Sequence, residues 1–153
     1  MDHSQFVSVT YIRTTVEKLW QALTQPDYTR QYWCDTWQDC DWKPGSSWRI
    51  IAPDGRMVDQ GAVVEADPPR RLSVTWRHEL NAEMLEEGYS RLTYELEQVG
   101  TSAKLTVTHE IDLPKSKLIH AVSTGWPMIL SSLKSLLETG ESLEESRHWP
   151  KGI

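Results

Sequence analysis

Hydrophobic residues near the C-terminal end of the chain repeat with the period of an α-helix. Their steps of three and four residues place them on one apolar stripe. The stripe consists of Trp126, Ile129, Leu133, Leu136 and Leu137. Gly140 follows this stripe, where a glycine C-cap is favoured. Pro127 has no N–H to donate, so it either kinks a helix that begins near residue 117 or lies in the first turn of one that begins near residue 124.

Most of the preceding chain alternates between apolar and polar residues, which is the period of a β-strand. Turn residues and a charged loop at 83–88 separate the alternating runs. Strands are predicted at 5–12, 35–42, 46–52, 58–66, 70–79, 89–98 and 102–111. Two short helices are predicted between the first two strands. One covers 16–23, with Thr14 as N-cap and Glu17 completing a capping box, and the other covers 26–33 and begins at Pro26.

Counting every second residue gives each long strand one apolar and one charged face, so one side of the sheet is covered and the other is wet. We predict an α+β fold in which a curved, antiparallel, seven-stranded sheet wraps around the long C-terminal helix. Residues 1–140 form this single domain. Residues 141–153 form a polar tail, in which Trp149 is assigned no role.

Composition and charge narrow the classes of function. A chain of 153 residues with 39% hydrophobic and 25% charged residues suits one globular domain. The net charge of −6 and the lack of a basic cluster argue against direct nucleic-acid binding. No apolar run approaches the roughly 20 residues of a membrane span, and the N-terminus lacks the pattern of a signal peptide. We therefore predict a cytoplasmic protein with no membrane partner.

The aromatic content is unusual, because the chain has eight Trp residues and one Phe. Tryptophan combines a large apolar area with a single N–H, which suits either a core or the wall of a ligand cavity. Side chains expected on the covered face of the sheet and near the start of the last helix form the predicted ligand-binding set. The set is Trp48, Ile50, Trp76, Tyr94, His109, Trp126 and Ile129.

His109 is the one candidate catalytic residue. Alternation points its side chain inward and that of Glu110 outward. His109 is either a general base with Tyr94 as its polar partner or a buried, hydrogen-bonded histidine, and the second interpretation is favoured. His78 is interpreted in the same way.

Cofactor and metal signals are absent from the sequence. No histidine or cysteine pair has metal-ligand spacing, and no phosphate-binding or dinucleotide-binding glycine pattern occurs, so no metal or cofactor is predicted. Cys34 and Cys40 could pair or bind metal, but reduced thiols are the favoured interpretation.

Nearly the whole chain resembles the Hsp90-ATPase-activator-like (AHSA1-type) branch of the START/Bet v 1-like superfamily, also called SRPBCC proteins. The stretches that carry the resemblance are YI at 11–12, EKLWQALT at 17–24, YW at 32–33, DWKPGS at 41–46, VEADPPRRL at 64–72, TW at 75–76, LTVTHE at 105–110, GWP at 125–127 and LKSLLETG at 133–140. The resemblance implies a helix-grip fold: one strand, two short helices, six strands and a long helix over a cavity.

The resemblance also implies a small hydrophobic molecule as the partner, because members of the superfamily bind lipids, sterols, polyketides or plant hormones. We therefore expect a small-molecule binding protein, as a monomer or homodimer, with no catalysis required. The alternatives are a cyclase-like or hydrolase-like enzyme that uses the same cavity, and a partner protein of a transcriptional regulator or chaperone. Chaperone ATPase activation is not carried over, because this chain has no room for the co-chaperone's separate N-terminal domain.

Overall fold

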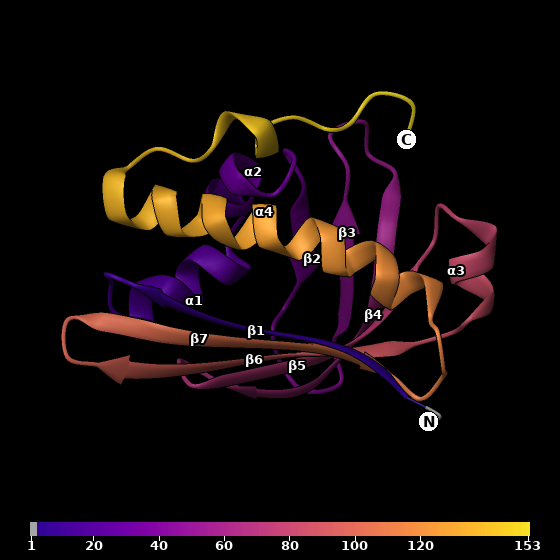
Figure 1. Cartoon of the computed structure of the whole chain (residues 1–153), viewed down its shortest axis with the longest axis horizontal. Coiled ribbons are helices and arrows are strands. Elements are labelled where there is room, and N and C mark those ends of the chain that lie inside the picture. Colours follow the sequence, from indigo (N-terminus) through magenta and orange to yellow (C-terminus); the bar gives the residue numbers. More distant parts are fainter. Residues whose placement is uncertain (1–2) are drawn as a thin grey trace.

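A curved sheet of seven antiparallel strands wraps around one long helix in the computed structural model, which describes residues 3–153 (Figure 1). Across the sheet the strands lie in the order β1-β7-β6-β5-β4-β3-β2. The strands are β1 (Ser4–Ile12), β2 (Trp37–Cys40), β3 (Ser47–Ile51), β4 (Met57–Asp67), β5 (Arg71–His78), β6 (Ser90–Val99) and β7 (Ser102–Ile111). The helices are α1 (Val16–Thr24), α2 (Pro26–Tyr32), α3 (Ala82–Glu86), α4 (Lys117–Thr139) and the 3₁₀ turn η1 (Glu144–Ser146). The predicted α+β class and helix-grip arrangement are confirmed.

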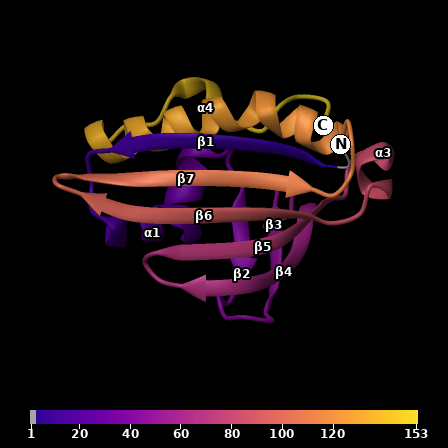
Figure 2. The ribbon, with the colours of Figure 1, turned by 60° about the horizontal axis from the view of Figure 1, so that its bottom comes forward.

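The sheet bends sharply within β4. Figure 2 shows β1, β7, β6 and β5 running side by side, whereas β2 and β3 cross them steeply. A Cβ atom on Gly61 would lie 1.9 Å from the carbonyl oxygen of Thr75 on β5, so only hydrogen fits at this crossing. The Thr75 hydroxyl accepts a hydrogen bond from the N–H of Ala62 at 2.9 Å. This close approach folds the sheet around the space that α4 covers.

The two short helices begin with local caps. The Thr15 hydroxyl accepts a hydrogen bond from the N–H of Lys18 at 3.2 Å, so Thr15 is the N-cap of α1 and the prediction of Thr14 is wrong by one residue. Gln98 of β6 explains the difference, because its side chain accepts from the N–H of Val16 and donates to the carbonyl of Thr14. Pro26 lies in the first turn of α2, as predicted.

Helix α4 takes the longer of its two predicted forms. Its N-cap is Ser116, whose hydroxyl accepts from the N–H of Ile119 at 3.1 Å, and Pro127 lies inside the helix. Gly140 ends the helix with a φ of 88°, in the left-handed region that favours glycine. Leu133 is fully buried, which places the second half of the helix in the core.

Two local predictions are corrected. The predicted charged loop at 83–88 contains α3, because the Asn81 side chain accepts hydrogen bonds from the N–H groups of Glu83 and Met84. The strand predicted at 35–42 is shorter, since Asp35 and Trp42 both have a φ of 59° and interrupt the extended backbone.

The C-terminal residues pack back on the domain. The buried hydroxyl of Ser132 on α4 accepts from the N–H of Leu143 at 2.9 Å and from the hydroxyl of Ser146 at 2.6 Å. Trp149 packs against the hydrophobic core, and the guanidinium of Arg56 lies 6.0 Å from the centre of its ring. Trp149 therefore has a structural role, which the polar residues around it in the sequence did not indicate.

The bend at Gly61 gives a direct test of this packing. We expect Gly61→Ala to lower the free energy of unfolding by at least about 1–3 kcal/mol, because the methyl group has to displace the backbone of Thr75. Gly125→Ala is the matched control: its Cβ meets nothing within 4 Å, and alanine in a helix should raise stability by about 0.5–1 kcal/mol. Urea unfolding measures both, and equal effects of the two changes would contradict the close approach.

Candidate functional site

A cavity of about 280 Å³ lies between the first half of α4, α3 and the β4–β5 part of the sheet. One face of α4 provides half of the lining, from side chains spaced three and four residues apart. These residues are Leu118, Ala121, Val122, Gly125, Trp126 and Ile129. The other lining residues are Trp33, Asp59, Trp76, His78, Met84 and Ile153. Apart from Asp59 and His78, every lining side chain is apolar or aromatic.

A cluster of four tryptophans includes the three that line this cavity, and Trp76 of β5 is at its centre. The Trp76 ring stacks on Trp33 with centroids 6.2 Å apart and planes 23° apart. The rings of Trp48 and Trp126 lie 4.9 Å and 6.1 Å from it. Three of these four side chains are at most 5% exposed, and Trp33 is 8% exposed. The contacts fix the rings, so the cavity wall is preformed.

Three buried indole N–H groups of the cluster each donate to a buried acceptor. Trp48 donates to the side-chain oxygen of Gln38 at 2.9 Å, and Trp126 donates to Nδ1 of His109 at 3.2 Å. Trp76 donates to Oδ1 of Asp59, also at 2.9 Å. These bonds explain why a glutamine, an aspartate and a histidine lie inside an apolar core.

Both ring nitrogens of His109 are occupied by protein groups. Nδ1 accepts from Trp126, so Nε2 carries the proton and donates to the Ser90 hydroxyl at 2.8 Å. Ser90 in turn donates to the carbonyl of Trp76 at 3.0 Å. Burial lowers the pKa of His109 to about 3, so the ring is neutral at neutral pH. This arrangement leaves no nitrogen free for the general-base role.

Tyr94 does not complete a catalytic pair with His109. Its hydroxyl is buried and has no hydrogen-bond partner among residues 3–153. Burial raises the pKa of Tyr94 strongly, so the phenol stays protonated. The Tyr94 ring instead meets Trp126 edge to face, with centroids 6.2 Å apart.

The structure divides the predicted ligand-binding set into two groups. Trp76, Trp126 and Ile129 line the cavity. The others lie in the core behind this wall and are not among the lining residues: Trp48, Ile50, Tyr94 and His109.

An acidic residue in the cavity wall escaped the sequence analysis. Asp59 of β4 pairs directly with His78 of β5 in the antiparallel ladder, so their side chains share one face. Oδ1 of Asp59 lies 2.8 Å from Nδ1 of His78. Burial raises the pKa of Asp59, while the hydrogen bond from His78 acts in the opposite direction. The inward position of Asp59 could have been predicted from alternation, because Asp59 has the same parity as the inward Val63 in the predicted strand 58–66.

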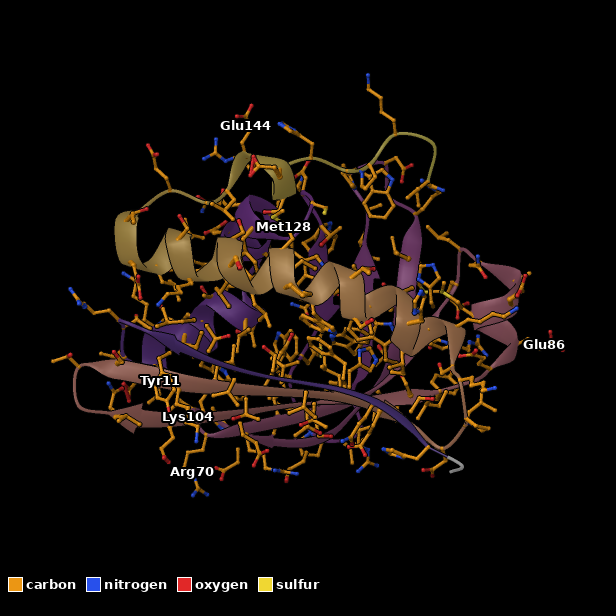
Figure 3. The ribbon with its side chains drawn as sticks, in the orientation of Figure 1. Tyr11, Arg70, Glu86, Lys104, Met128 and Glu144 are labelled. Atoms are coloured by element: carbon orange, nitrogen blue, oxygen red, sulfur yellow. The ribbon has the colours of Figure 1, made fainter. Side chains whose placement is uncertain are left out.

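Other parts of the molecule offer weaker candidates. A larger hollow of about 440 Å³ lies on the outer face of the sheet, where Arg70 and Lys104 point away from α4 (Figure 3). Its lining is largely charged and open to water, so it does not suit an apolar ligand. Cys34 and Cys40 are both free thiols, and no group of three metal-ligating side chains occurs within residues 3–153. None of the helices described is long and apolar enough to cross a membrane.

Comparison with known proteins identifies the family. A sequence model of the activator of Hsp90 ATPase homolog 1-like (AHSA1) proteins matches residues 13–138. The chain belongs to this family. The resemblance inferred from the sequence is therefore confirmed. No curated protein matches the chain.

Solved structures of AHSA1-like shape support the same fold. Protein MLL2253 from Mesorhizobium loti has a TM-score of 0.74 and 25% identity, over 88% of this chain and 96% of that one. The Aha1 dimer from Colwellia psychrerythraea has a TM-score of 0.70 and 20% identity, over 91% and 99% of the two chains. DynU16, described as a putative protein in the dynemicin biosynthetic locus, has a TM-score of 0.74 and 20% identity, over 96% of this chain and 51% of its own.

The buried His109 predicts a specific dependence of stability on pH. Its folded pKa of about 3 lies below the ordinary 6.5, so its contribution is present above pH 6.5 and is lost as pH falls toward 3. We expect the wild-type protein to lose about 1.4 kcal/mol per pH unit from this residue between pH 6 and pH 4. His109→Gln should remove that part of the slope in urea unfolding.

The other titrating groups are common to both proteins, so the difference between the slopes isolates His109. His120→Gln removes an exposed histidine on α4 and should leave the wild-type pH dependence unchanged. Parallel slopes for the wild type and His109→Gln would show that His109 is not held neutral by burial.

Proposed function

We propose that the protein binds a small, flat, apolar molecule in the cavity between α4, α3 and the sheet. The observation that carries this proposal is the opposition of small residues on α4 to a fixed aromatic wall. Ala121 and Gly125 occupy lining positions on α4, where larger residues would fill the space. The rings of Trp33 and Trp76, which pack against Trp126 of the same helix, are the aromatic part of the lining, so a planar ligand would meet aromatic faces.

The size of the cavity limits the ligand. Small-molecule pockets usually measure about 300–1,000 Å³, and this one measures about 280 Å³. One or two fused rings suit such a volume better than a sterol or a long lipid. The superfamily resemblance implies ligand binding, which agrees with a small apolar ligand in this cavity. DynU16, a structure of similar fold, is described as a putative protein in the dynemicin biosynthetic locus.

Binding without catalysis is the favoured form of this function. The enzyme alternative assigned the acid–base role to His109, whose two nitrogens are both engaged by Trp126 and Ser90. The hydrogen bonds of the indole N–H groups fix the aromatic rings before a ligand binds. A ligand that makes apolar contacts with these rings therefore does not have to order them.

Indane, a flat bicyclic hydrocarbon, is a suitable probe of the cavity. At ten times its Kd we expect it to stabilise the fold by about 1.4 kcal/mol, which raises Tm by about 3–6 °C in a chain of this size. Ala121→Phe should abolish the shift, because its ring fills the cavity. Thr124→Phe is the matched control: Thr124 is exposed on α4 and is not a lining residue, so the shift should remain. No shift in the wild type, or an equal shift in Ala121→Phe, would contradict binding at this cavity.

Self-association is a second proposal, favoured by an apolar row on the edge strand β1. Val7, Val9 and Tyr11 are about half exposed, at 50%, 51% and 50%, on the outer side of the sheet. Such a row is a candidate contact between two copies of the chain. The solved Aha1 relative from Colwellia psychrerythraea is described as a dimer, which supports this reading at the level of the fold.

Sedimentation equilibrium tests the homodimer. We expect the wild-type chain to sediment as a dimer at micromolar concentration and Val9→Lys to sediment as a monomer, because a charge in the contact would have to lose its water. Val99→Lys, at an exposed valine on β6, should leave the dimer intact. A wild-type protein that is monomeric throughout would rule out this contact.

A further inference from the structure

The apolar cavity has one polar end. Asp59 and His78 are the ionisable side chains in its lining, and they lie opposite each other on β4 and β5. The Asp59 side chain is buried, whereas the His78 side chain is 20% exposed. His78 is therefore the more exposed of the two polar side chains that line the cavity.

The hydrogen bonds fix the orientation and the tautomer of His78. Oδ1 of Asp59 accepts from the indole N–H of Trp76, and two donors on one carboxylate oxygen favour the ionised carboxylate. In the neutral imidazole the proton then lies on Nδ1 of His78 and is donated to Asp59. Nε2 then carries a lone pair, and no hydrogen-bond partner contacts it within residues 3–153.

A bulge in β4 lies directly beside Asp59. Ile50 of β3 pairs with Asp59, whereas the next residue, Ile51, pairs with Met57. Val58 is the extra residue, and both Val58 and Asp59 are buried. Alternation alone would place these two neighbours on opposite faces, so the bulge is what buries both of them; bulges are common beside functional sites.

We infer that Nε2 of His78 is the recognition point for a hydroxyl group, and that the ligand is a hydroxylated aromatic molecule. This inference rests on the binding function proposed above. The ring of the ligand lies against Trp76 and Trp126, and its O–H donates to the imidazole lone pair. Asp59 is a positioning residue, because its Oδ1 holds the imidazole in place.

Charge selects a neutral hydroxyl over a carboxylate. A carboxylate ligand has no proton to donate at neutral pH, and it would approach the ionised Asp59 behind the imidazole. A hydrocarbon would leave the lone pair of Nε2 without a partner. A phenol or a similar hydroxylated ring satisfies both the apolar wall and the single acceptor.

Three indane derivatives separate these possibilities: indane, 5-indanol and indane-5-carboxylate. A net hydrogen bond of about 0.5–1.5 kcal/mol predicts that the wild-type protein binds 5-indanol roughly two- to twelve-fold more tightly than indane. The carboxylate should bind more weakly than indane. Isothermal titration calorimetry at neutral pH measures all three affinities.

His78→Leu should make 5-indanol bind no better than indane while indane binding persists. His120→Leu removes an exposed histidine outside this cavity and should keep the wild-type preference. The ¹⁵N resonances of the wild-type protein give a second readout that does not require a variant to fold. Nε2 of His78 should appear as an unprotonated nitrogen, and its signal should shift with 5-indanol and stay in place with indane.

The outcomes distinguish this inference from the proposed function. If indane binds and 5-indanol has no advantage, or if the carboxylate binds best, the hydroxyl recognition is wrong and the apolar cavity stands. If His78→Leu retains the preference for 5-indanol, another group recognises the hydroxyl and the assignment to His78 is overturned. If none of the three compounds binds, the proposed function itself fails.

Discussion

The structure depends on the need of buried indole N–H groups for hydrogen-bond acceptors. An unpaired buried N–H costs about 1–3 kcal/mol, so a core built from tryptophan rings requires polar residues at fixed places inside it. Gln38, Asp59 and His109 meet this need, each from a different strand. These three bonds fix the ring positions, and the fixed rings define both the core and the wall of the cavity.

The same hydrogen bonds separate structural polar groups from functional ones. His109 uses both of its nitrogens inside the core, and its neutrality follows from burial. His78 lines the cavity and uses one nitrogen for Asp59, while its other nitrogen has no hydrogen-bond partner within residues 3–153. Two histidines that alternation places on one face of the sheet therefore differ in what they can offer a ligand. Gly61, on the same strand as Asp59, allows β4 to approach Thr75 of β5 closely.

Much of the fold could be predicted from the sequence, because alternation and helical periodicity record which face of each element is buried. The candidate site was harder to predict, since register and bulges decide which inward residues meet. Trp76 and Trp126 were placed inside correctly, but the bulge at Val58 and the pairing of Asp59 with His78 depend on neighbouring strands. The shift of the helix cap to Thr15 has a similar origin, because Gln98, distant in sequence, sets it.

The central claim is that a ligand lies against the tryptophan wall beneath the first half of α4. The indole N–H region of a ¹H–¹⁵N correlation spectrum tests it most directly, because each of the eight tryptophans gives one signal. On addition of a saturating flat aromatic ligand, we expect the signals of Trp33, Trp76 and Trp126 to shift, and those of Trp20, Trp37 and Trp42, which do not line the cavity, to stay in place. Shifts confined to the second group would contradict the account.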